Sequence, residues 1–176
     1  MAHLVLVVEN GTQVVGANSF VSVVDFREYA ENRGVILPVT DSLVIPFLVK
    51  ALDYIESKAC EFQGTLVLET QALSWPRSGA IVNGRNIAQT SIPKQLIDAQ
   101  CQAAIAVNAG LELLPNSTVS DYVIEETVGP ITTKYADPSK VRLGNLAPTL
   151  GAVDTLLAPL FKTCEASTFS LMTVRV

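Results

Sequence analysis

Two long stretches of this sequence carry apolar residues at the 3.6-residue period of an amphipathic helix. The clearer stretch, residues 41–62, places Leu48, Leu52 and Ile55 on one face and most of its charged residues opposite. Pro46 lies near the start of this stretch, where a missing N–H costs least, so we expect the regular helix to begin close to that residue. A helix with one apolar face needs a neighbour to cover it, and the pattern therefore predicts packed helices.

The stretch 91–113 predicts a second long helix, with Ser91 as its cap and Pro93 in its first turn. Its expected face consists mostly of small residues: Ile97, Cys101, Ala104, Ile105 and Asn108. Small residues let helix axes approach closely. Such a face fits either a tight core or a contact between subunits, and the sequence leaves both open.

Two shorter helices are expected on either side of this pair. Ser22 followed by Asp25 resembles a capping box, and Gly34 is a natural stop, so the first helix lies between them. The last helix is expected in residues 151–161, where Pro159 ends or kinks it.

Extended structure is expected outside the helices. Alternating polar and apolar residues around Gly129-Pro130 predict a β-hairpin over about 119–136, and Asn83-Gly84 predicts a smaller hairpin turn. The fold class is thus mainly α: a small bundle of about four helices with an added β-hairpin and extended N- and C-terminal arms. Residues 1–161 form one domain, and residues 162–176 form a C-terminal extended arm.

Charge and composition bear on the partners of the chain. Only 16% of its residues are charged, the net charge is −5, and no run of basic residues occurs. Nucleic-acid-binding proteins usually carry a basic stripe, because phosphate contacts dominate their affinity. The acidic balance argues against such a function, and the scarcity of charge hints at buried protein–protein surface.

The sequence contains no convincing catalytic or metal-binding constellation. Its one histidine is His3, near the start of the chain, and its three cysteines lack the spacing of metal ligands or redox pairs. No phosphate-binding glycine motif occurs either. We therefore expect no enzyme, no metal, no cofactor and reduced thiols. The apolar run at 4–8 is too short for a signal peptide or a membrane span, so no membrane association is expected.

The tripeptide Trp75-Pro76-Arg77 is the most unusual local feature. Pro76 biases Trp75 toward an extended backbone, which could aim the indole inward as a structural anchor for an irregular loop. Arg77 could then satisfy loop carbonyls or helix C-termini, or stack on the ring. Candidates for a subunit or partner interface come from the expected hairpin and arm: Tyr122, Ile124, Val128, Ile131, Tyr135, Phe169, Leu171 and Val174.

Six segments also resemble a phage protein family in order and spacing, from about residue 8 to residue 161. They are "VENGTQVVGANSFVSVVDFREYAENRG", "KALDYIES", "QALSWPRSG", "IPKQLIDAQCQAA", "VGPITTKYA" and "VDTLLAPLF". The family is often labelled DnaT-like single-stranded-DNA-binding protein, and its members are similar to the head–tail connector adaptors of tailed phages. Residues 162–176 fall outside the resemblance.

The resemblance implies a structural virion protein, made in the host cytoplasm and placed at the head–tail interface. It would form a ring of twelve copies beneath the portal protein, extend the DNA channel and dock the next connector or tail protein. Genome DNA would pass without tight binding, which the acidic charge favours through repulsion. The alternative is a single-stranded-DNA-binding replication accessory, as the label says. An enzyme from a prophage or host is a third reading.

Overall fold

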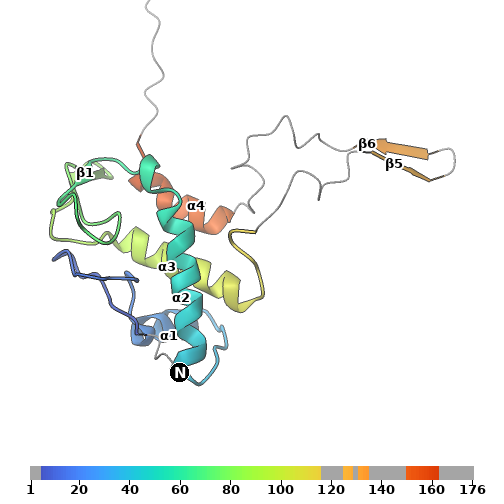
Figure 1. The fold of residues 1–176 in the computed structure, drawn as a ribbon, viewed down its shortest axis with the longest axis horizontal. Helices are drawn as coiled ribbons and strands as arrows, with labels where there is room; N and C mark the ends of the chain where they lie inside the picture. The colour runs from blue at the N-terminus through green and yellow to red at the C-terminus, as the bar shows by residue number, and fades with distance from the viewer. Residues whose placement is uncertain (1–4, 116–124, 129–130, 135–149, 163–176) are drawn as a thin grey trace, which may run out of the picture.

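The computed structural model describes residues 5–115, 125–128, 131–134 and 150–162 (Figure 1). Four α-helices lie within these residues: α1 (Val23–Glu31), α2 (Asp41–Glu56), α3 (Lys94–Asn108) and α4 (Gly151–Leu157). The short 3-10 helices η1 (Ala59–Glu61) and η5 (Ala158–Leu160) follow α2 and α4. The expected class, mainly α with about four helices, is confirmed.

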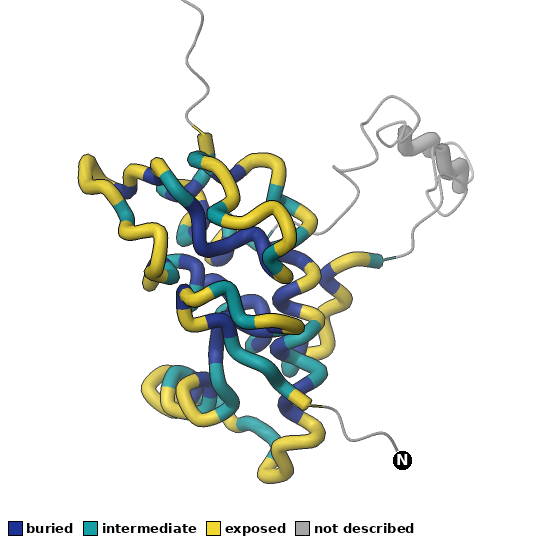
Figure 2. Tube along the Cα trace, turned by 60° about the vertical axis from the view of Figure 1, so that its left-hand side comes forward, coloured by how far each residue is buried: buried dark blue, intermediate teal, exposed yellow. Residues whose placement is uncertain are grey.

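The helices pack around α3. It contacts α2 along one side and α4 along another, and α1 packs against both α2 and α3. Figure 2 shows the buried stretches running through the middle of the body, with exposed residues at its loops. The largest side chains in this core come from every helix and include Phe26, Leu48, Ile55, Leu96 and Leu157, none with measurable exposure.

Both expected ends of α1 are confirmed. The Ser22 hydroxyl accepts a hydrogen bond from the Asp25 amide at 3.1 Å and donates one to the Asp25 carboxylate at 2.6 Å. Gly34 adopts a φ of +68°, and the Val35 amide bonds back to the Ala30 carbonyl at 2.9 Å, the pattern of a Schellman stop.

The predicted start of α2 is wrong. The helix begins at Asp41, so Pro46 lies inside it and removes one helical hydrogen bond. Val44 and Ile45, which come just before the proline, are buried in the core. Their burial needs helical geometry ahead of Pro46, and we infer that it outweighs the lost bond. The helix also ends at Glu56, before the predicted end of this stretch.

The predicted cap and face of α3 need correction as well. Pro93 occupies the N-cap position, and no side chain, including that of Ser91, caps the helix. Ile97 and Ile105 are only half-buried. The buried residues are Leu96, Ala99, Gln100, Cys101, Ala103, Ala104 and Val107. Because α2, α4 and α1 all pack against α3, its buried face is wider and turned from the expected one. The small residues there serve a tight core.

Six short strands form three two-stranded antiparallel sheets within the described residues. They are β1 (Thr65–Leu66) with β2 (Arg77–Ser78), β3 (Ile81–Val82) with β4 (Arg85–Asn86), and β5 (Glu125–Val128) with β6 (Ile131–Lys134). Asn83 and Gly84 both have positive φ between β3 and β4, as the predicted turn requires. The hairpin β5–β6 lies inside the predicted range 119–136 but is shorter.

The two arms are described only in part. In the N-terminal segment, Val8 makes a single parallel bridge to Ser19, so residues 4–8 form no regular strand in their described portion. At the other end, Pro159 falls within η5, where the helix was expected to end or kink. Residues 163–176 lie outside the described residues, and the domain boundary after residue 161 stays a prediction.

Candidate functional site

The Trp75 corner lies in the core. Trp75 is fully buried, and its indole meets the Phe62 ring edge to face with 6.0 Å between centroids. Phe62 in turn stacks on Phe161 at 5.4 Å, so three aromatic rings join the loop after α2 to the segment after α4. The peptide bond between Trp75 and Pro76 is cis. The contribution of this corner to stability stays a prediction.

Arg77 is buried beside it and serves the backbone. Its guanidinium donates to the carbonyls of Gln63 at 2.8 Å, Gly64 at 3.0 Å and Ser74 at 3.2 Å. Of the three roles predicted for Arg77, its hydrogen bonds fit the first, in which the guanidinium bonds to carbonyls of the loop. Burial lowers the pKa of Arg77, and the nearby Glu56 carboxylate opposes that shift. These hydrogen bonds direct the guanidinium into the loop.

Glu56 ties the same corner to the end of α2. Its carboxylate accepts hydrogen bonds from the Ser74 amide at 3.0 Å and from the Ser74 hydroxyl at 2.7 Å. Burial raises the pKa of Glu56, while the bonds from Ser74 and the charge of Arg77 act in the other direction. The polar side chains of the corner are therefore engaged with one another and with the loop backbone.

Most cations of the described body have a partner within it, although only Arg77 is buried. Arg77 is buried, and the Arg33 guanidinium lies over the Tyr29 ring at 3.4 Å. Four further cations are in ion pairs: Arg27 with Asp41, Lys50 with Glu112, Lys58 with Asp154, and Lys94 with Asp98. Arg85 is exposed and makes no ion pair within the described residues.

Arg85 lines a shallow groove of about 470 Å³ between the β3–β4 hairpin and the start of α3. Lys94 and Ser91 line the opposite side of this groove. A backbone phosphate would find two cations there, but Lys94 is already paired with the Asp98 carboxylate at 2.6 Å. The groove therefore offers one cation without an ion pair, Arg85, and one that is shared with a carboxylate, Lys94.

Aromatic side chains offer little stacking surface. Five aromatic residues of the described body are buried: Phe20, Phe26, Tyr54, Phe62 and Trp75. Phe47 and Phe161 are half-buried, and so is Tyr29, which carries the Arg33 guanidinium over its ring. Non-specific binding of single strands generally combines a cationic groove with exposed aromatic faces. In the described body the aromatic rings are buried or half-buried, and Arg85 is the cation of the groove that has no ion pair.

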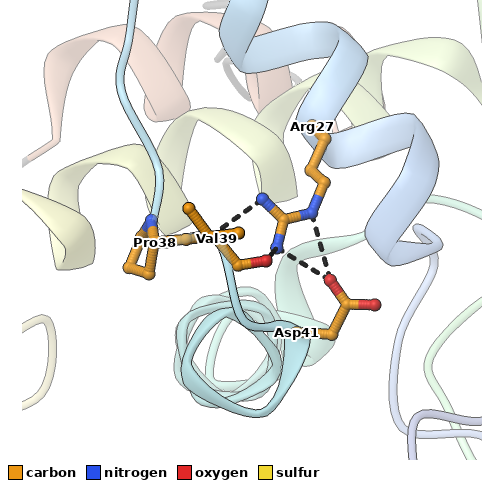
Figure 3. Close-up of polar contacts among 4 residues, drawn as sticks. All are labelled: Arg27, Pro38, Val39 and Asp41. Atoms are coloured by element: carbon orange, nitrogen blue, oxygen red, sulfur yellow. Dashed lines mark hydrogen bonds and ion pairs between the residues drawn. The ribbon is translucent and has the colours of Figure 1, made fainter.

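The loop between α1 and α2 has the opposite character. Figure 3 shows the Arg27 guanidinium holding it: Arg27 donates to the carbonyls of Pro38 and Val39, each at 2.9 Å, and to the Asp41 carboxylate at 2.7 Å. The loop is thereby tied to α1 and to the first residue of α2. Yet Ile36 and Val39 are 90% and 94% exposed. Two branched aliphatic side chains thus stand in solvent on a braced loop.

Sequence reasoning missed this loop. The run "VILPV" at 35–39 between two helices is apolar and uncharged, and that signal could have marked it as an exposed apolar connection. Arg27 itself carries no local signal of its role, because its partners lie eleven to fourteen residues away in the sequence.

Most of the residues predicted to form a subunit or partner interface lie outside the described ranges. Val128 and Ile131 are paired directly across the β5–β6 hairpin. The others lie outside the described residues: Tyr122, Ile124, Tyr135, Phe169, Leu171 and Val174. That any of these residues contacts a partner stays a prediction.

The residues that the structure describes hold no metal-binding cluster and no membrane-spanning helix. Within the described ranges, no group of three or more histidine, cysteine or acidic residues is placed to hold a metal ion. No helix there has the length and apolar character needed to cross a bilayer. Cys60 and Cys101 are both free thiols, the first exposed and the second buried.

A family model described as "Putative DnaT-like ssDNA binding protein" matches residues 4–176. The chain belongs to this family. The match covers nearly the whole chain, including the C-terminal residues that the resemblance left out. The family's description agrees with the single-stranded-DNA alternative, and no comparison supports a connector role. No curated protein and no solved structure matches the chain.

Proposed function

We propose that this protein is a structural, non-catalytic component that works by assembling with copies of itself and with other proteins, as a head–tail connector does. One observation carries the proposal: most cations of the described body are already paired within it and its aromatic rings are buried or half-buried, while Ile36 and Val39 stand exposed on a braced loop. Exposed aliphatic residues held in one geometry favour protein contacts, because little entropy is lost on binding.

The electrostatics support the same proposal. The net charge of −5 repels the phosphate backbone, and a protein that lines a DNA channel must let the genome slide. In this proposal a ring of copies, twelve as the resemblance implies, sits beneath the portal protein and receives the next connector or tail protein.

Binding of single-stranded DNA is the second candidate, and the family description favours it. The groove between Arg85 and Lys94 is the place in the described body where such binding would start. In this second candidate, the groove would contribute only part of the attraction to phosphate. Residues outside the described ranges would supply the rest of the DNA-binding surface.

Titration with a labelled single-stranded oligonucleotide separates the two candidates. DNA binding predicts tight association at low salt that weakens steeply as salt rises, and a clear loss in the variant with Arg85→Ala and Lys94→Ala. The connector proposal predicts weak binding that this double variant leaves unchanged. Val15→Ala, at a 94% exposed site away from the groove lining, serves as the matched control.

The connector proposal also has a positive test. Mass spectrometry of purified phage particles should find the protein, and negative-stain images of the protein mixed with portal protein should show an added ring. Its absence from intact particles, together with tight DNA binding at physiological salt, would establish the second candidate instead.

A further inference from the structure

The sequence contains two Asn-Gly pairs, Asn10-Gly11 and Asn83-Gly84. An asparagine followed by glycine is prone to deamidation, because glycine has no side chain to hinder attack by its backbone nitrogen on the asparagine amide. The reaction also depends on how the backbone is held, since the glycine nitrogen has to reach the amide carbon. The structure places the two pairs in contrasting surroundings.

Asn83 and Gly84 form the exposed turn of the β3–β4 hairpin. Within the part of the chain that the structure describes, the Asn83 side chain and the Gly84 N–H make no hydrogen bond. Each strand of this hairpin has two residues. A two-stranded hairpin is marginal by itself, so this turn can change its backbone conformation at small cost.

The loop that contains the other pair is held by the buried carboxylate of Glu9. This carboxylate accepts hydrogen bonds from the backbone amides of Gly11 at 2.7 Å, Gln13 at 3.1 Å and Val14 at 2.8 Å. Hydrogen bonds to a charged group are stronger than those between neutral groups. The nitrogen that would attack the Asn10 amide is therefore fixed in place.

Asn10 and Gly11 have further partners. The Asn10 side-chain oxygen accepts hydrogen bonds from the Thr12 amide at 3.1 Å and from the Thr12 hydroxyl at 2.7 Å. Gly11 is buried with a φ of +102°, and a Cβ at this position would lie 2.1 Å from the Thr90 carbonyl oxygen. Both reacting groups of this pair are therefore held by the fold.

We propose that Asn83 is a site of spontaneous deamidation, and that the fold protects Asn10 from the same reaction. The Gly84 nitrogen loses its proton to water and forms a bond to the Asn83 side-chain carbonyl carbon. The bond between that carbon and the amide nitrogen breaks, and the nitrogen takes up a proton and leaves as ammonia. The resulting succinimide ring then adds one water molecule at either of its carbonyl groups, which gives aspartate or isoaspartate. No oxidant or reductant takes part.

Deamidation changes the charge of the groove between the β3–β4 hairpin and the start of α3. Asn83, Arg85 and Lys94 all line this groove. Either product replaces the neutral amide of Asn83 by a carboxylate, which lowers the positive charge available there. Aspartate still suits the two-residue turn, whereas isoaspartate adds a methylene group to the main chain. The inference goes beyond the proposed function and does not depend on it.

The unmodified full-length chain provides the main test, because it contains both pairs. The folded protein is kept in mildly alkaline buffer, and mass spectrometry of its peptides follows deamidation of Asn83 and Asn10 over time. A hydrogen bond to a charged group that has to break first slows a reaction by about tenfold or more. Asn83 should therefore deamidate at least about tenfold faster than Asn10. In urea the two rates should become similar, because the protection of Asn10 is lost with the fold.

Two variants serve as controls. Asn83→Gly removes the reacting amide and leaves a Gly-Gly pair that suits the same turn. The acidic form that anion exchange detects in the aged unmodified chain should be missing from this variant. Glu9→Gln removes one carboxylate oxygen from the protected loop and should speed deamidation of Asn10, with circular dichroism to check folding. If Glu9→Gln does not fold, the comparison of the two sites in the unmodified chain still decides.

Three outcomes would overturn the inference. They are similar rates at the two sites in the folded chain, faster reaction at Asn10, and an Asn83 that stays intact in the folded chain but reacts in urea. A folded Glu9→Gln variant in which Asn10 reacts no faster would show that Glu9 does not provide the protection. None of these results bears on the connector proposal, which is tested on phage particles.

Discussion

Trp75→Ala is the change that most directly measures the role of the aromatic corner. Trp75 is fully buried and makes an edge-to-face contact with Phe62. Replacing it with alanine therefore leaves a cavity in the core. Truncation of a buried aromatic residue costs about 3–5 kcal/mol. Since domains of this size unfold with about 5–15 kcal/mol, the variant should lose about a fifth or more of its stability.

The loss can be followed by urea unfolding with far-ultraviolet circular dichroism, because the variant has no tryptophan fluorescence. The unfolding midpoint should fall without a change in the slope of free energy against urea. In thermal unfolding, a chain of this length should lose roughly 6–20 °C, at about 2–4 °C per kcal/mol.

Trp75→Phe is the matched control. The indole N–H of Trp75 is buried and has no hydrogen-bond partner within the described residues, and a buried unpaired donor costs free energy. Phenylalanine removes that donor and keeps an aromatic ring beside Phe62, so it should cost clearly less than alanine. A loss below about 1 kcal/mol for Trp75→Ala would refute the reasoning, because no buried anchor can be removed so cheaply.

Three further predictions concern single side chains. Arg77→Lys should destabilise the chain by about 1–3 kcal/mol in urea unfolding, because an ammonium group cannot reach all the loop carbonyls that the guanidinium bonds. Unchanged stability would show that these hydrogen bonds are not needed. Burial raises the pKa of Glu56 above its ordinary value of 4.5, so its contribution to stability is present below that pH and is lost as the pH rises through the folded pKa. Glu56→Gln should therefore lessen the fall in stability on going from about pH 4 to pH 7, and identical pH profiles would contradict this sign. Burial also raises the pKa of Cys101 to about 12, so a thiol reagent should label the exposed Cys60 and leave Cys101 unlabelled until the chain unfolds; mass spectrometry of the labelled peptides checks this, and early labelling of Cys101 would contradict it.

Features set by neighbouring residues could be predicted well. Ser22, Asp25 and Gly34 mark the ends of α1, and Asn83-Gly84 marks the β3–β4 turn. In each case the hydrogen bonds and φ angles involve residues only a few positions apart, so the residue types alone carry the signal.

Features that depend on burial could not be predicted in the same way. Pro46 suggested a later start for α2, but core contacts of the residues before it extend the helix to Asp41. The buried face of α3 is wider than predicted and rotated, because three helices pack against it. Neither result follows from periodicity, since a period does not say how many neighbours a helix has.

The sequence by itself determined the mainly α class, the approximate positions of the helices, the turns and the acidic balance, because each depends on local propensity or on simple composition. Only the tertiary structure decided where the side chains are used. Arg77 lies within the Trp75 corner, Arg27 braces a loop eleven residues away, and Ile36 and Val39 remain in solvent. Long-range packing assigns these roles, because it determines which groups lose water and which keep it.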